Sequence, residues 1–266
     1  MKNILTRKAA LAEVTENYII NSKYEIIDEE ALKNNIKVRS VCSSNVEVIK
    51  QRAFWGCSAL KEASFTKLRR IYDGGFENCS NLREFILISD LQEIGNASFQ
   101  KCKKLRRVIF QNNIYCKNIP NRAFAECRDL EEIRFPERVE NIEAYAFYKC
   151  DHLKNIELPE TVKNIGEKAF YQCAFESIIL PSRLECIGDS AFLKCKQLQY
   201  IKIPENVKRI GKWAFHGYGN LKVLELTHDP QYIGEWITNK NCTIRCKKGS
   251  KIEKYAQFYG VNIELM

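Results

Sequence analysis

With 266 residues, 45% of them hydrophobic, the chain is long enough to bury a continuous core in one large domain or two small ones. Its formal net charge of +9 is modest, and acidic and basic residues alternate along most of the chain, which argues against a dedicated nucleic-acid groove. No stretch approaches the roughly 18 apolar residues that a membrane-spanning helix needs, so we expect no membrane insertion.

Residues 1–45 are predicted to form an N-terminal cap and a degenerate first coil. The run Ile4–Glu16 has moderate helical character, and Leu32 stands 22 residues before Phe54, in phase with the repeat that follows. The first residues contain no apolar run of about seven residues, so they make a poor secretory leader. We therefore expect a cytoplasmic protein, with a secreted or cell-surface location as the alternative if a leader precedes the sequence given.

Residues 46–234 repeat one motif eight times. An isoleucine is followed five residues later by a phenylalanine and, in seven copies, by a cysteine three residues further on, as in Ile165, Phe170 and Cys173. Such a period is typical of a solenoid, in which each coil buries its apolar face only against its neighbours. The phenylalanines, 22–25 residues apart, are Phe54, Phe76, Phe99, Phe124, Phe147, Phe170, Phe192 and Phe215.

The repeated cysteines are predicted to form one internal column of reduced thiols, each packing as a small apolar residue. They are Cys57, Cys79, Cys102, Cys127, Cys150, Cys173 and Cys195. One cysteine per coil does not bring four ligands together around a metal ion, so no metal site is expected. In five units a glycine follows the isoleucine, as Gly166 does, and a bend with positive φ is expected there. The A-F-x-x-C segment predicts a short helical or 3₁₀ turn.

Each unit also contains a short segment of alternating apolar residues, which predicts a strand with one buried face. Stacked coils would align these strands in a parallel ladder about 35 Å long. Ile86 and Ile109 are predicted to lie side by side on its exposed face as an apolar centre with a polar rim, although strand propensity alone could place isoleucine there. The candidate binding residues are Ile86, Ile109, Arg107, Arg134, Glu132, Glu157, Ile179, Tyr200 and Lys202.

Residues 235–266 are predicted to form a C-terminal cap of strand, helix and strand. Ser250 and Glu253 fit a capping box at the start of the helix, and Gly260 is suited to ending it. No Pro/Gly/Ser-rich linker interrupts the chain, so cap, repeats and cap are expected to form one structural domain.

The pattern I-G-x-x-A-F-x-x-C-x-x-L-x-x-I-x-L-P, best seen at 165–181, 187–204 and 142–159, resembles the BspA-like (Treponema-type) leucine-rich repeat family. The resemblance implies an α/β leucine-rich-repeat solenoid. This is a curved right-handed superhelix of about eight coils of 22–25 residues, with a parallel sheet along one face, short helical or 3₁₀ turns and capped ends. Members of the family are commonly regarded as interaction or adhesion proteins of bacteria and some protozoa.

Catalytic motifs are absent from the sequence. The three histidines, His152, His216 and His228, have no metal-like neighbours, and no nucleophile or phosphate-binding string occurs. Cys242 and Cys246, near several cations, could form a redox-sensitive pair, but strand and cap cysteines are the simpler interpretation. We expect no enzyme, no catalytic residues and no cofactor.

The densest basic run spans residues 101–122 and offers nucleic-acid binding as a minor alternative. Arg107 should stack between Glu84 and Glu132 of the adjacent coils, which partly neutralises the run. The leading prediction is therefore a non-catalytic scaffold, with monomer favoured, that binds a protein partner of unknown identity through the exposed strand ladder. An adhesin that binds host or matrix protein is the alternative if a leader was removed.

Overall fold

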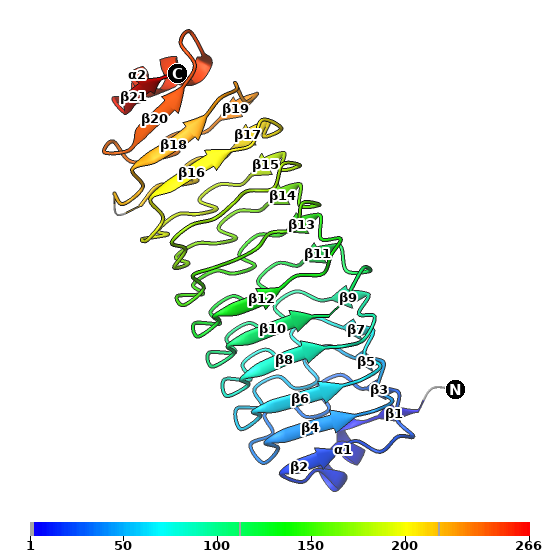
Figure 1. Ribbon diagram of the computed structural model, residues 1–266. Helices are drawn as coiled ribbons and strands as arrows, with labels where there is room; N and C mark the ends of the chain where they lie inside the picture. The colour runs from blue at the N-terminus through cyan, green and yellow to red at the C-terminus, as the bar shows by residue number, and fades with distance from the viewer. Residues whose placement is uncertain (1–2, 112, 218) are drawn as a thin grey trace. The chain divides into compact units, whose positions relative to one another are not determined.

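The computed structural model describes residues 3–111, 113–217 and 219–266, which form a parallel β solenoid (Figure 1). Among these residues, eleven two-residue strands mark about eleven turns. The predicted fold is thus confirmed, but the predicted count of eight coils is wrong. Two regular coils within residues 4–45 lack the phenylalanine–cysteine signature, and a further coil begins at Ile233, so the motif alone did not reveal them.

Two compact units divide the chain, Met1–Val139 and Glu140–Met266. In the first unit, five short strands pair in the order β1-β3-β5-β7-β9 and six longer ones in the order β2-β4-β6-β8-β10-β12 (Figure 1). The short strands are β1 (Ile4–Leu5), β3 (Ile26–Ile27), β5 (Val48–Ile49), β7 (Arg70–Ile71) and β9 (Glu93–Ile94), followed by β11 (Asn118–Ile119). The longer ones are β2 (Asn17–Ile19), β4 (Ser40–Ser43), β6 (Glu62–Phe65), β8 (Glu84–Leu87), β10 (Arg107–Phe110) and β12 (Glu132–Arg134), and helix α1 (Arg7–Glu13) lies in the first coil.

The second unit repeats this arrangement with one interruption. Its short strands are β13 (Asn141–Ile142), β14 (Asn164–Ile165), β15 (Cys186–Ile187), β17 (Arg209–Ile210) and β19 (Tyr232–Ile233). Its longer strands pair in the order β16-β18-β20-β21 and are β16 (Tyr200–Ile203), β18 (Val223–Leu226), β20 (Thr243–Cys246) and β21 (Asn262–Leu265). Helix α2 (Lys251–Tyr259) is capped by the Ser250 hydroxyl, which accepts from the Glu253 amide at 3.2 Å, and by left-handed Gly260.

The interruption falls at residues 153–158 and 177–180, where strands were predicted and none forms. The Phe170 unit is one residue short between Cys173 and Ile178, which accounts for the gap at 177–180 but not for the one at 153–158, since the Phe147 unit has the regular spacing. The predicted ladder is therefore not continuous within this unit.

Aromatic stacking and thiol hydrogen bonds hold the core of each coil against the next. Within the first unit, the rings of Phe54 and Phe76 stack at 4.9 Å with 3° between their planes, and Phe147 and Phe170 of the second unit stack at 5.3 Å. The cysteine thiols do more than fill space. The Cys79 thiol donates to the carbonyl oxygen of Phe54 one coil earlier at 3.1 Å, and the same bond recurs at Cys57, Cys102, Cys127, Cys173 and Cys195. Burial raises the pKa of Cys195 to about 12.

The segment that closes each coil is a chain of β-turns, and no 3₁₀ helix is assigned to it among the described residues. Left-handed residues fall three and seven positions after the anchoring isoleucine; after Ile49 they are Arg52 (φ 51°) and Gly56 (φ 71°). Because left-handed and right-handed residues alternate in the turns, every second backbone amide points toward the adjacent coil. The Phe54 amide, for example, donates to the Gly75 carbonyl at 2.8 Å. Even the turns thus take part in bonding between coils.

The glycines after the isoleucines do not have the positive φ that was expected. Glycine is required at these positions because the backbones of two adjacent coils approach closely there. A Cβ on Gly166 would lie 2.6 Å from the backbone nitrogen of Ala144 in the preceding coil. Gly95, Gly188, Gly211 and Gly234 are equally crowded, with a Cβ meeting the preceding coil at 2.3–2.6 Å.

Candidate functional site

The strand face of the first unit carries five of the predicted binding residues. Arg107 lies in register between Glu84 and Glu132, as predicted, and forms ion pairs with them at 3.5 and 3.1 Å. Ile86 is 40% exposed, but Ile109, which was expected to be exposed, is only 9% exposed. Its neighbours in register, Ile86 and Arg134, are long side chains that stand on either side of it. The predicted apolar pair is thus reduced to one accessible isoleucine.

The strand face of the second unit carries the other four predicted binding residues. Glu157 is exposed, but it does not line the groove that the other three share. Ile179 is 84% exposed, Tyr200 is 46% exposed, and both line a groove of 750 Å³ together with Lys202. One wall runs along residues 176–182 and the other along residues 199–204, with Glu160 at the far end. The groove therefore follows the strand direction for about six residues, or roughly 20 Å. We call it the Ile179 groove.

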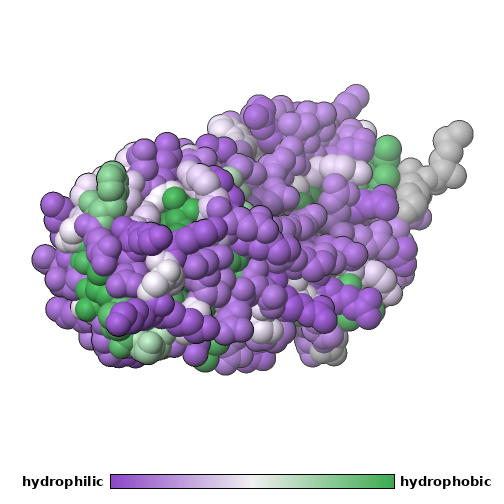
Figure 2. Space-filling model, turned by 90° about the horizontal axis from the view of Figure 1, so that it is seen from above, coloured by the Kyte–Doolittle hydropathy of each residue, from purple (hydrophilic) through white to green (hydrophobic). Residues whose placement is uncertain are grey.

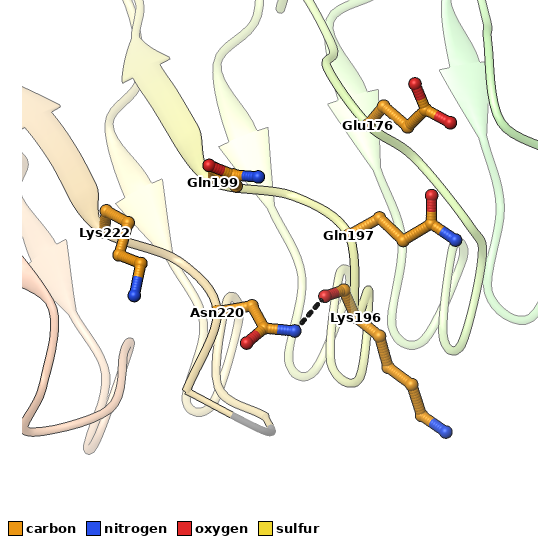
Figure 3. Close-up of a pocket in the computed structure, with 6 residues that line it drawn as sticks. All are labelled: Glu176, Lys196, Gln197, Gln199, Asn220 and Lys222. Carbon is orange, nitrogen blue, oxygen red and sulfur yellow. Dashed lines mark hydrogen bonds between the residues drawn. The ribbon is translucent and has the colours of Figure 1, made fainter.

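A polar hollow of 480 Å³ continues the Ile179 groove at the end where β16 begins, because Glu176 and Gln199 line both. Figure 3 shows Gln199 at the start of the strand, with Glu176 on the neighbouring coil. The Asn220 side chain donates to the Lys196 carbonyl and ties two loops of the hollow together (Figure 3). Its remaining lining residues are Gln197 and Lys222.

Glu225 on β18 explains why Ile179 is left uncovered. The Tyr200 hydroxyl donates to Glu225 at 3.0 Å, and the Lys202 ammonium pairs with it at 3.1 Å. Both side chains therefore lean toward β18 and away from Ile179. Arg245 on β20 approaches the same carboxylate from the other side at 3.2 Å. Glu225 thus positions two residues of the groove wall.

Three donors also set the protonation state of Glu225, which is only 8% exposed. Burial by itself raises the pKa of this carboxyl, but the hydrogen bonds from Lys202, Tyr200 and Arg245 outweigh burial and hold the pKa below its ordinary value. The carboxylate is therefore ionised near neutral pH, and its bonds to the groove wall are intact there.

Glu225 was not among the candidate binding residues predicted from the sequence. The repeat does place Lys202 beside it. Arg245, which pairs in register with Glu225 from the next strand, lies in residues 235–266, where the A-F-x-x-C signature does not occur. A search for opposite charges in register on three successive strands would have found this cluster.

The other candidates contribute less to a site. Cys242 and Cys246 are both buried, and burial raises the pKa of each thiol, so neither has the lowered pKa of a reactive cysteine. Burial also lowers the pKa of His216.

On the face seen in Figure 2, apolar side chains form small separate patches within a largely hydrophilic surface. None of the described helices is long and apolar enough to cross a membrane.

Parallel coils of 22–25 residues, an internal phenylalanine ladder and one strand face per coil define a leucine-rich repeat protein. Residues 12–116 and 117–245 match the family model for the BspA type leucine rich repeat region, in six copies. The chain therefore belongs to the BspA-type leucine-rich repeat family, and the predicted resemblance is confirmed.

Solved structures show the same fold. A leucine-rich repeat protein from Bacteroides ovatus aligns with a TM-score of 0.56 at 20% identity, over 97% of this chain and 85% of the other. One from Eubacterium ventriosum aligns with a TM-score of 0.60 at 20% identity, over 65% of this chain and 46% of the other. No curated protein matches the chain.

Proposed function

We propose that this protein is a non-catalytic scaffold that binds another protein through the Ile179 groove. The observation that carries the proposal is the exposure of Ile179 beside Tyr200 in a groove on the strand face. Leucine-rich repeats are typical of protein-binding scaffolds, and the family to which the chain belongs agrees with that role. A cytoplasmic location, with the cell surface as the alternative, stays a prediction that fractionation of the native source can test.

The energetics favour this surface over the predicted surface around Ile86 and Ile109. Burying one isoleucine side chain contributes about 1.5–3 kcal/mol, and tyrosine is enriched among the residues that dominate binding energy. Ile179 and Tyr200 offer both contributions within one groove. On the first unit, by contrast, Ile109 is already covered and Arg107 is engaged in two ion pairs. The same ion pairs weaken the case for nucleic acid at residues 101–122.

The test uses the full chain as bait in the native source, with quantitative mass spectrometry of what it captures. We expect Ile179→Asp to lose a partner that the wild type retains and to weaken the purified complex at least tenfold, since a buried unpaired carboxylate is strongly unfavourable. Ile36→Asp is the matched control, because Ile36 is 74% exposed and lies outside the groove. Equal capture by all three baits would show that the groove is not the binding surface.

A further inference from the structure

We propose that the Ile179 groove takes an extended peptide segment that carries an apolar anchor residue and, about four residues away, an acidic residue. The inference rests on the proposed function and adds the chemistry of the partner. It comes from three features of the second unit: the direction of the groove, the uncovered apolar floor and the charge that is left unpaired at one end.

The shape of the groove fits an extended chain. Its two sides, residues 176–182 and 199–204, belong to adjacent coils and follow the strand direction, so a segment of about six residues can lie along them in an extended conformation. An extended segment can place one side chain directly on Ile179.

The floor of the groove favours an apolar anchor. Ile178, Ile179 and Leu180 form one side, and Tyr200 and Pro204 form the other. Two charged groups of the groove are already occupied, because Lys202 is paired with Glu225 and the Glu160 carboxylate accepts from both the amide and the hydroxyl of Ser182. An apolar side chain therefore gains more from this floor than a charged one would.

The charge of the polar hollow favours an acid. Among the described residues, the Lys222 ammonium forms no ion pair or hydrogen bond, whereas Glu176 lies 3.9 Å from the ammonium of Lys154. The side-chain amides of Gln197 and Gln199 can add donors elsewhere in the hollow. A carboxylate in the hollow would thus find an unpaired cation, whereas a polyanion such as nucleic acid would also meet Glu160 and Glu176 in the groove.

The register gives the spacing between the two contacts. Val223 pairs with Tyr200, so Lys222 lies one coil beyond Gln199 and two coils beyond Glu176, about three positions before Ile179 along the strand direction. Three positions of about 3.3 Å cover about 10 Å along the groove, and side chains bridge the two strand spacings of about 4.8 Å across it, so the two contacts lie about three to four residues apart in an extended chain.

Selection from a phage-displayed random dodecapeptide library against the full-length protein tests the proposal, with Ile179→Asp for counter-selection. We expect enriched peptides to combine an aliphatic or aromatic residue with Asp or Glu about three to five positions away. Lys222→Glu should weaken an enriched peptide at least tenfold and shift a new selection toward Lys or Arg. Lys61→Glu, an equal charge change on the first unit, should change the affinity less than twofold.

The proposal is overturned if no peptide is enriched, if enriched peptides bind Ile179→Asp equally well, if they are basic, or if a single-stranded oligonucleotide binds the groove instead. Circular dichroism and thermal melting confirm that each variant is folded. A captured natural partner separates the two proposals. If its binding depends on Ile179 but not on Lys222, the acidic contact is wrong and the scaffold function stands, whereas independence from Ile179 overturns both.

Discussion

At the residue scale, Glu225 links the stability of the second unit to the shape of its groove. Its carboxylate bonds three side chains, from β16 and β20, and two of them line the groove wall. Without its charge, Glu225 would no longer hold Lys202, and the Lys202 side chain would be free to fold over Ile179. A neutral residue at this position should therefore lower both the free energy of unfolding and the access of a partner to the groove.

We expect Glu225→Gln to reduce the free energy of unfolding by about 1–3 kcal/mol, because charge-assisted hydrogen bonds at a nearly buried carboxylate are lost. Urea denaturation measures the change. Glu132→Gln is the matched control: Glu132 also binds two cations, Arg107 and Arg134, but it is more exposed, so the loss should be no more than about 1 kcal/mol. Equal losses in the two variants would contradict the role given to Glu225.

The pH dependence has a definite sign. Because the folded-state pKa of Glu225 lies below its ordinary value of 4.5, the carboxylate stabilises the fold above pH 4.5, and this contribution is lost as the pH falls through the lower, folded-state pKa. Below pH 4.5 the wild type should therefore lose more stability than Glu225→Gln. Parallel pH profiles for the two proteins would contradict this expectation.

At the scale of the element, the coil spacing is set by backbone contact as well as by side chains. The amides of the closing turn donate to the next coil, and the glycine after the isoleucine lies against the backbone of the preceding coil. A methyl group inserted there must push two coils apart, which would also stretch the thiol and amide bonds beside it.

Gly166→Ala should therefore destabilise the protein by about 3 kcal/mol through overpacking, as measured by thermal or urea unfolding. Gly249→Ala is the control, since Gly249 has a φ of +78° but nothing within 4 Å of an added Cβ. It should lose only about 1 kcal/mol from left-handed strain. If Gly249→Ala were the more damaging variant, backbone conformation rather than close approach would explain the glycines.

At the scale of the whole molecule, the repeated core predicts how the thiols react. Of the twelve cysteines, Cys42 is exposed, Cys186 and Cys195 are half-buried and the other nine are buried. Reaction with a thiol reagent needs both access and the thiolate, and burial raises the pKa of such thiols as Cys79, Cys127 and Cys173.

Titration of the native protein should show one fast thiol and at most two slow ones, and all twelve should react after denaturation. Cys42→Ala should remove the fast phase and leave the others unchanged. Fast reaction of many thiols in the native state would mean that the column is not packed as described. Fewer than twelve reactive thiols after denaturation, without reductant, would reveal disulfides.

Much of the fold could be predicted from the sequence, because a repeated coil must place the same residue type at the same height in every turn. The period alone therefore predicts the stacked phenylalanines and the register that brings Arg107 between Glu84 and Glu132. The added coils at the two ends could not be predicted in this way, since they keep the shape of the repeat without its phenylalanine and cysteine.

The site depended on interactions that the repeat does not encode. Whether an outward side chain is exposed is decided by which way its neighbours on adjacent coils lean: Ile109 is covered, whereas Ile179 is uncovered because Tyr200 and Lys202 turn toward Glu225. The sequence alone thus determined the solenoid and its register, which follow from the periodic burial of apolar residues. Only the tertiary structure decided where the strand face opens into a groove, because that depends on ion pairs and hydrogen bonds between coils.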